Sequence, residues 1–197
     1  MVKLVLASAS PRRAELLRQL GVEFEQASAD IDEQRLPDES AENYVVRLAQ
    51  QKSAHVQRAL QADRAVLAAD TCVVLEDVIL GKPEGHFDAL AMLARLSGRE
   101  HRVLTAVCVR RLDQLEETMT DTRVKFVTLT RQQCESYLAT DEPWDKAGAY
   151  AIQGLAGAFV ESIQGSYSGV VGLPLAQTWQ LLVRLGVATG VDGGPFE

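Results

Sequence analysis

The sequence predicts an α/β protein, because short apolar strands and amphipathic helices alternate along most of the chain. Two apolar runs carry this prediction: residues 4–7, and residues 65–75, which are apolar almost throughout, as in a strand covered on both faces. Two alternating segments, 101–112 and 118–129, predict an antiparallel pair with one exposed face. We expect a single domain over residues 1–197.

The composition argues against several classes of protein. With 20 Lys and Arg residues against 27 Asp and Glu residues, the formal net charge is -7. An acidic chain lacks the broad basic surface that nucleic acids and anionic membranes require, so we expect neither as a partner. The three cysteines lie far apart without Cys-x-x-Cys spacing, which is typical of reduced core thiols in a cytoplasmic protein. No stretch of the sequence approaches a membrane span.

The first strand leads directly into a helix that begins with hydroxyl and basic residues. Ser8 and Ser10 follow the strand; Ser10 suits a helix N-cap, and Pro11 suits the first helical position. Arg12 and Arg13 then lie at a helix N-terminus, where free N–H groups and the helix dipole favour an anion. This pattern predicts a phosphate site, and a pair of solvated surface arginines is the alternative.

An acidic loop and a second helix follow the next strand, residues 22–27. The loop contains Glu33, and it is either a solvated charged segment or part of a divalent-cation site. Ser40 begins a helix over residues 41–60, and Lys52 projects from the apolar stripe of this helix. Spacing alone favours an ammonium group that extends to solvent over one that meets an anion in a cleft.

Asp70 and Thr71 interrupt the apolar run of residues 65–75. A carboxylate inside such a run is unfavourable unless it is paired, bound to a metal or part of a site. Burial would raise the pKa of this carboxyl, and a nearby cation would lower it again. Asp70 is therefore the strongest candidate for a catalytic carboxylate, and a bulge or turn aspartate that accepts from nearby N–H groups is the alternative.

Residues 76–77 form a predicted hairpin turn that leads to the loop 81–83. Lys82 stands between glycine and proline in this stiff loop, which makes it a candidate phosphate contact. A helix is expected over residues 87–96, and His101 in the following strand is expected on the surface.

The segment 141–157 is rich in glycine and also contains an aromatic ring, an amide and charges. Such a loop lets a ligand approach the backbone, and Gln153 can read a base edge through its paired donor and acceptor. An irregular connection is the alternative. Residues 130–133 predict a capping box before this loop, and the last helix is expected over 175–185 with Trp179 facing the core.

Several short motifs stand in a specific order along almost the whole chain. They are Ala7-Ser-Ala-Ser-Pro-Arg-Arg13, Lys52, Ala69-Asp-Thr71, Gly81-Lys-Pro83, Asp145-Lys-Ala-Gly-Ala-Tyr150, Gln153-Gly154 and Gly172-Leu-Pro174. In these motifs the chain resembles the Maf family of nucleoside triphosphate pyrophosphatases. The resemblance implies a Maf/ITPase-like α/β fold, in which a long twisted mixed sheet is flanked by helices and two lobes surround a central cleft.

The resemblance also implies a reaction: hydrolysis of a nucleoside triphosphate to the monophosphate and diphosphate, with Mg²⁺ or Mn²⁺ as the cofactor. Thr71 and Gln153 match the branch that acts on dTTP and UTP, whereas the branch that acts on 7-methyl-GTP typically carries Gln and Glu there. The resemblance marks Arg12, Thr71 and Gln153 for specificity and Asp70 as the proton acceptor. Ala9, where close relatives often have Gly, is a small departure.

Residue chemistry and resemblance together yield one hypothesis for the site. Asp70 activates the attacking water and holds the divalent cation with Glu33. The phosphate-binding residues are Ser8, Arg13, Lys52 and Lys82. The alternative functions are a 7-methyl-GTP pyrophosphatase and a nucleotide-binding regulator of septum formation. The family also implies a homodimer.

Overall fold

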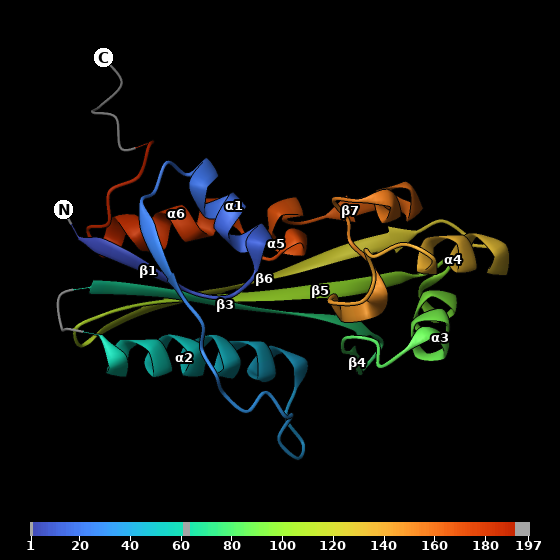
Figure 1. The fold of residues 1–197 in the computed structure, drawn as a ribbon, viewed down its shortest axis with the longest axis horizontal. Coiled ribbons are helices and arrows are strands. Elements are labelled where there is room, and N and C mark those ends of the chain that lie inside the picture. The colour runs from blue at the N-terminus through green and yellow to red at the C-terminus, as the bar shows by residue number, and fades with distance from the viewer. Residues whose placement is uncertain (1, 61–63, 192–197) are drawn as a thin grey trace. The chain divides into compact units, whose positions relative to one another are not determined.

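The computed structural model describes residues 2–60 and 64–191, in which helices are interspersed with strands (Figure 1). The strands are β1 (Lys3–Ala7), β2 (Phe24–Ala27), β3 (Arg64–Leu75), β4 (Val78–Leu80), β5 (Glu100–Arg111), β6 (Gln114–Phe126) and β7 (Val160–Gln164). The helices are α1 (Pro11–Gln19), α2 (Ala41–Ala59), α3 (His86–Leu96), α4 (Arg131–Leu138), α5 (Tyr167–Val171) and α6 (Leu175–Arg184), with short 3-10 helices η1 (Ala147–Ala149) and η2 (Leu155–Phe159).

The strands of the described residues form one seven-stranded mixed sheet, which confirms the predicted α/β class. Its order is β2-β1-β3-β5-β6-β7, and β4 pairs with β3. β1 is parallel to β2 and β3, whereas the pairs β3–β4 and β6–β7 are antiparallel. No helix within residues 2–60 and 64–191 has the length and apolar character needed to cross a membrane.

Two compact units divide the chain. Unit 1 consists of Met1–Asp70, Thr105–Met119 and Gly172–Glu197, and unit 2 consists of Thr71–Leu104 and Thr120–Val171. The strands β3, β5 and β6 contribute residues to both units. The single domain and the central cleft between two lobes stay predictions.

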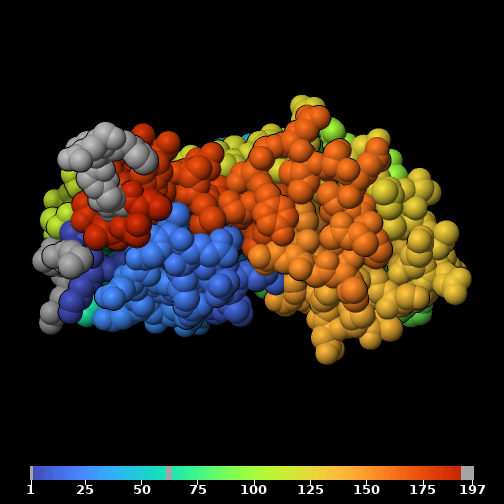
Figure 2. All heavy atoms as spheres, turned by 90° about the horizontal axis from the view of Figure 1, so that it is seen from above, coloured from blue at the N-terminus to red at the C-terminus, as the bar shows by residue number. Residues whose placement is uncertain are grey.

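In unit 1, the connections between the parallel strands determine where the helices lie. The connection through α1 leads from β1 to its neighbour β2, and the connection through α2 leads back across β1 to β3. Because crossovers between parallel strands are right-handed, opposite directions of travel place α1 and α2 on opposite faces. Figure 1 shows α2 on one face and α1 with α6 on the other, and Figure 2 shows the blue segment that contains α1 beside the red segment that contains α6.

The face of the sheet under α2 is an apolar core. Its buried residues are Val5, Ala7, Val56, Val66 and Ala68. Val66 and Ala68 lie two residues apart in β3 and both face α2. Since side chains alternate along a strand, the same alternation directs Asp70 toward α2 and Thr71 toward the opposite face.

The predicted helix starts are confirmed. Ser10 and Ser40 each accept a hydrogen bond from the N–H group three residues later, and Thr130 forms a reciprocal capping box with Gln133. The prediction missed the short helix α5, and β6 begins at Gln114 rather than at residue 118. The turn ahead of β6 is thus tighter than its polar composition indicated.

Three predictions about exposure are wrong. β5 is buried on both faces along most of its length, because β3 and β6 flank it in the middle of the sheet. His101 is consequently 2% exposed, and its Nε2 atom lies 2.8 Å from the Tyr150 hydroxyl. Trp179 is 37% exposed, because Leu181 and Leu182 form the core-facing side of α6.

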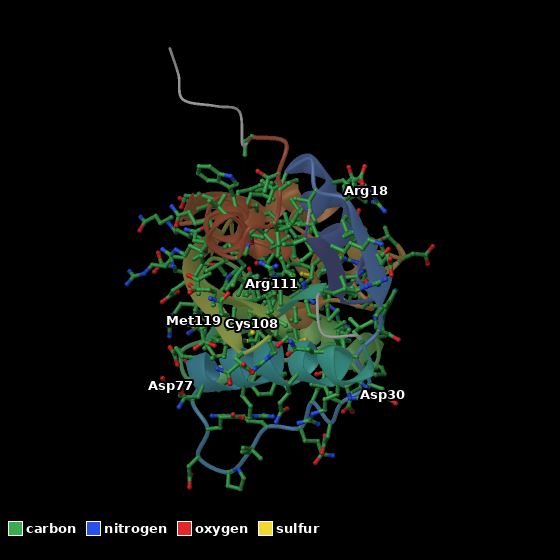
Figure 3. The ribbon with its side chains drawn as sticks, turned by 90° about the vertical axis from the view of Figure 1, so that its left-hand side faces the viewer. Arg18, Asp30, Asp77, Cys108, Arg111 and Met119 are labelled. Atoms are coloured by element: carbon green, nitrogen blue, oxygen red, sulfur yellow. The ribbon has the colours of Figure 1, made fainter. Side chains whose placement is uncertain are left out.

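All three cysteines are buried and free, as predicted. The Sγ atom of Cys108 lies 3.2 Å from the Ser53 hydroxyl of α2, and burial raises the pKa of this thiol. Figure 3 shows Cys108 on the side of α2 and Arg111 toward α6. A cavity of about 220 Å³ lies beside Cys108 between α2, β5 and β6. The predicted site residues do not line this cavity, which is bordered by Val46, Ala49, Ala106, Val107, Cys108, Glu117, Thr118 and Met119.

We expect His101→Gln to remove a pH dependence of stability. Burial lowers the pKa of His101 from 6.5 to about 4. Between these values the unfolded chain binds a proton that the native protein does not bind. The free energy of unfolding therefore falls as the pH is lowered through this window, by ~3 kcal/mol at most. Glutamine does not titrate and can keep a hydrogen bond with Tyr150.

Urea unfolding at about pH 7 and about pH 4.5 measures this effect as the difference between wild type and variant. The difference isolates His101 from other groups, such as Asp70, that also titrate on unfolding. An identical change in stability for both proteins would contradict the assignment.

Candidate active site

The carboxyl ends of β1, β2 and β3 place several predicted residues near one edge of unit 1. Ligands of open α/β sheets bind outside the carboxyl ends of parallel strands, where the connections leave toward opposite faces. β1 and β2 are such neighbours, since α1 follows β1 on one face of the sheet and α2 follows β2 on the other. Ser8 follows β1 directly, and Glu33 lies in the loop after β2. Asp70 lies three residues beyond Leu67, the last residue of β3 that pairs with β1.

The N-terminus of α1 has the polar arrangement that the sequence predicted. The Ser8 hydroxyl accepts from the Arg13 guanidinium at 3.3 Å, and Arg13 Nε donates to the Gly172 carbonyl at 2.9 Å. Burial lowers the pKa of Arg13, and the negative charge of Asp70 opposes this effect. Arg12 is half-buried on the same first turn. Phosphate binding by these residues stays a prediction.

The ammonium group of Lys52 lies between two carboxylates. Its Nζ atom is 2.6 Å from Asp70 Oδ1 and 2.8 Å from Glu33 Oε1. The side chains of Lys52 and Asp70 are 11% and 8% exposed, whereas that of Glu33 is 51% exposed. The expectation from spacing alone, that Lys52 extends to solvent, is therefore wrong, whereas the family resemblance gave Lys52 a reason to face inward. β3 presents a buried carboxylate opposite this turn of α2, which the spacing of apolar residues in α2 does not reveal.

Asp70 has a raised pKa despite its cationic neighbours. Burial raises the pKa above its ordinary value of 3.8, while Lys52 and Arg13 favour the charged form and Glu33 disfavours it. Once ionised, a carboxylate with a raised pKa is a better proton acceptor than a solvated one. Asp70 lies within β3 and not in a turn, and its carboxylate accepts from the Lys52 ammonium.

Two residues of α2 fix the loop that carries Glu33. The Tyr44 hydroxyl donates to the Glu33 carbonyl at 3.0 Å, and Arg47 donates to the Gln34 carbonyl at 3.0 Å. Arg47 also pairs with the buried carboxylate of Glu39 at 2.6 Å, which holds its guanidinium in place. Sequence reasoning missed both anchors, although Tyr44 and Arg47 are three residues apart and share a face of the helix.

Unit 2 holds the other predicted residues. Thr71 lies in β3, and Lys82 and Gln153 are exposed in the loops after β4 and η1. A backbone hydrogen bond joins the loop of Lys82 to η1, because Gly148 N–H donates to the Gly81 carbonyl at 3.0 Å. Gly148 adopts a φ of +71°, where an added Cβ would crowd β3. The loop of Lys82 is therefore fixed against η1, the short helix that precedes the loop of Gln153.

The donor set fits a divalent cation of the kind that the resemblance implies. Asp70 and Glu33 both contact the Lys52 ammonium, so their carboxylates are close enough to share a cation. In the part of the chain that the structure describes, no group of three or more His, Cys, Asp or Glu side chains could hold a metal. Mg²⁺ is often held by one or two carboxylates together with substrate phosphates and waters. These two carboxylates therefore suit a cation that arrives with a nucleotide.

Comparison with known proteins places this arrangement in context. Residues 3–185 match the sequence profile of the family described as Maf-like protein. The dTTP/UTP pyrophosphatase of Pseudoalteromonas atlantica is 54% identical over 188 residues, covering 94% of this chain and 98% of that protein. The dTTP/UTP pyrophosphatase of Methylobacillus flagellatus is 52% identical over 189 residues, covering 95% of each. The solved structure of the Staphylococcus aureus Ham1 protein matches 63% of this chain and 71% of that one, at 15% identity and a TM-score of 0.45. A similarity of this size carries no functional argument.

We expect Lys52→Met to lower the free energy of unfolding by about 3–5 kcal/mol near neutral pH, because Asp70 would lose its nearest cation while buried. The loss should shrink as the pH falls, since an Asp70 without Lys52 binds a proton at higher pH in the native state. Adding Asp70→Asn should recover most of the loss. Urea unfolding of the wild type, both single variants and the double variant measures this coupling. A Lys52→Met variant as stable as the wild type at neutral pH would contradict it.

Proposed function

The chain belongs to the Maf family, and from this premise we propose that it hydrolyses dTTP and UTP to the nucleoside monophosphate and diphosphate. The observation that carries the proposal is 52–54% identity, over nearly the whole chain, to relatives named dTTP/UTP pyrophosphatase. The cluster of Lys52, Asp70 and Glu33 supports it, because a triphosphate and its counterion need cations and carboxylates close together.

We assign Asp70 as the group that accepts the proton of the attacking water. Lys52 contacts the Oδ1 atom of Asp70 in the structure, and the carboxylate of Asp70 is the group that accepts from the water. As the water oxygen bonds to phosphorus, its proton passes to Asp70 and the α–β anhydride bond breaks. The electron pair of that bond leaves with the diphosphate. The raised pKa of Asp70 suits this role, because it strengthens the ionised carboxylate as a base.

Cationic and N–H groups of the chain stabilise the negative charge of the triphosphate. We assign Arg13, Lys52, Ser8 and the N–H groups at the start of α1 to the phosphates, together with Lys82 of unit 2. A cation held by Asp70 and Glu33 would supply further neutralisation of the phosphates. Lys52 lies between these carboxylates in the structure, so it is placed to turn from them toward a phosphate.

Base selectivity is assigned to Arg12, Thr71 and Gln153. The Gln153 amide offers one acceptor and two donor hydrogens. Uracil and thymine present a carbonyl oxygen beside a ring N–H, which a correctly oriented amide matches with two hydrogen bonds. Cytosine presents an amino group beside an unprotonated ring nitrogen and would need the reversed amide.

Diphosphate release from dTTP, UTP, CTP, ATP, GTP and 7-methyl-GTP tests the reaction and its substrates. We expect release from dTTP and UTP, and a fall in kcat of about 10²–10⁴-fold in Asp70→Asn, because that variant lacks the base. Asp77→Asn is the matched control, since Asp77 is an exposed aspartate in the turn after β3 (Figure 3).

An Asp70→Asn variant with full turnover would exclude Asp70 as the base. Preference for 7-methyl-GTP would keep the enzyme class but change the substrate. Tight nucleotide binding without release from any substrate would favour the regulator.

The cation requirement is tested by chelation and by a variant of Glu33. We expect a chelator to abolish turnover, and Glu33→Gln to raise the Mn²⁺ concentration for half-maximal activity by at least ~10-fold. The reason is the loss of one of two carboxylate ligands. Asp30→Asn is the control, because Asp30 is an exposed aspartate of the same loop. Equal Mn²⁺ requirements in Glu33→Gln and Asp30→Asn would remove Glu33 from the cation site.

A further inference from the structure

Gln153 stands on a hydrogen-bonded turn of unit 2. The N–H of Gly154 donates to the Ala151 carbonyl at 3.0 Å, which closes a four-residue turn with Gln153 in its third position. The side chain of Gln153 is exposed, and η2 begins immediately after the turn, at Leu155. The direction of the amide therefore depends on what holds the two ends of this turn.

The buried hydroxyl of Tyr137 holds the first end. The N–H of Ala151 donates to it at 3.1 Å. Burial raises the pKa of Tyr137, and the nearby carboxylate of Glu142 raises it further, so this hydroxyl stays neutral. Tyr150, one residue before the turn, is anchored by its hydrogen bond to the buried ring of His101.

The carboxylate of Glu142 holds the second end. Its two oxygens lie 2.9 and 3.0 Å from the backbone nitrogen of Leu155. This N–H is the first of η2 and has no partner within the helix, so a carboxylate acceptor stabilises it. The same carboxylate lies against the Cα atom of Gly154, where an added Cβ would collide with it. Glycine at this position leaves the room that the contact requires.

Glu142 is itself held on both sides of its Cα atom. Its N–H donates to the Thr140 hydroxyl at 3.3 Å, and its carbonyl accepts from Lys146 Nζ at 2.7 Å. The segment after α4 therefore presents the carboxylate from a fixed backbone. Tyr137 and Glu142 are only five positions apart. Tyr137 holds Ala151, two residues before Gln153, and Glu142 holds Leu155, two residues after it.

We propose that Glu142 is a positioning residue that sets base selectivity through Gln153 without touching the nucleotide. This proposal rests on the proposed function and on the assignment of Gln153 to base recognition. An amide distinguishes uracil from cytosine only when its donor and acceptor face the base in one orientation. A turn fixed before binding supplies that orientation and reduces the freedom lost when the nucleotide binds.

Two variants remove the contact of Glu142 in different ways. Glu142→Ala deletes the acceptor, and Gly154→Ala puts a methyl group where the carboxylate lies. The φ of Gly154 is -109°, outside the left-handed region that favours glycine. Glu142→Gln keeps one acceptor oxygen for Leu155. Glu161→Ala is the matched control, because it deletes an exposed glutamate of unit 2 that pairs with Lys125.

We expect Glu142→Ala and Gly154→Ala each to lower the ratio of kcat/KM for UTP to that for CTP by roughly 10- to 100-fold, the scale of a small misplacement. The loss should appear in KM for UTP more than in kcat. Glu142→Gln should stay close to the wild type, and Glu161→Ala should not change the ratio. Adding Glu142→Ala to Gln153→Ala should lower the ratio no further than Gln153→Ala alone.

Hydrogen exchange without nucleotide tests the contact independently of turnover. The Leu155 amide should exchange faster in Glu142→Ala and Gly154→Ala than in the wild type and Glu161→Ala. If the Leu155 amide exchanges at the wild-type rate in both variants, the proposal is overturned. This readout does not depend on turnover. Faster exchange with an unchanged UTP to CTP ratio would also overturn it. Absence of wild-type turnover, by contrast, contradicts the proposed function. In that case hydrogen exchange at Leu155 decides separately whether Glu142 holds the turn.

Discussion

The burial of Asp70 is the constraint around which the candidate site is arranged. A carboxylate on the core-facing side of β3 is stable only with a cation close to it, and Lys52 of α2 supplies that cation at 2.6 Å. The contact requires α2 to pack closely on the sheet, which the apolar core around Val56, one turn further along the helix, provides. Glu33 then joins the pair from the partly exposed side. Core packing and the chemistry of the site therefore depend on the same helix.

Four charges near this edge of unit 1 balance one another. Arg13 and Lys52 are positive, Asp70 and Glu33 are negative, and each cation acts on the pKa of Asp70 or contacts its carboxylate. A balanced cluster suits a substrate that itself brings opposite charges, such as a triphosphate with a divalent cation. Phosphates can then replace carboxylates as partners of the cations, and the divalent cation can take the carboxylates. This exchange gives a physical reason for four charged groups at the end of apolar strands.

Local patterns predicted most helices and strands, and they failed where the answer lay in the sheet order. Alternation in the segment of β5 indicated a half-exposed strand, but β5 lies between two other strands and is buried. The prediction that His101 lies on the surface failed for the same reason. The burial of His101 comes from the position of β5 and from contact with Tyr150, which lies far along the chain. The loop anchors Tyr44 and Arg47 escaped prediction because their partners are backbone carbonyls, which carry no residue-specific signal.

The sequence by itself determined the α/β class, the helix caps, the family and the identity of most candidate site residues. Each of these is encoded in neighbouring residues or in motifs of fixed order. Only the tertiary structure decided that Glu33 shares the Lys52 ammonium with Asp70, and that Glu142 and Tyr137 hold the turn of Gln153. The direction of a long polar side chain depends on which partner the fold brings within hydrogen-bond distance. That partner often lies on another element, so the periodicity of one segment cannot reveal it.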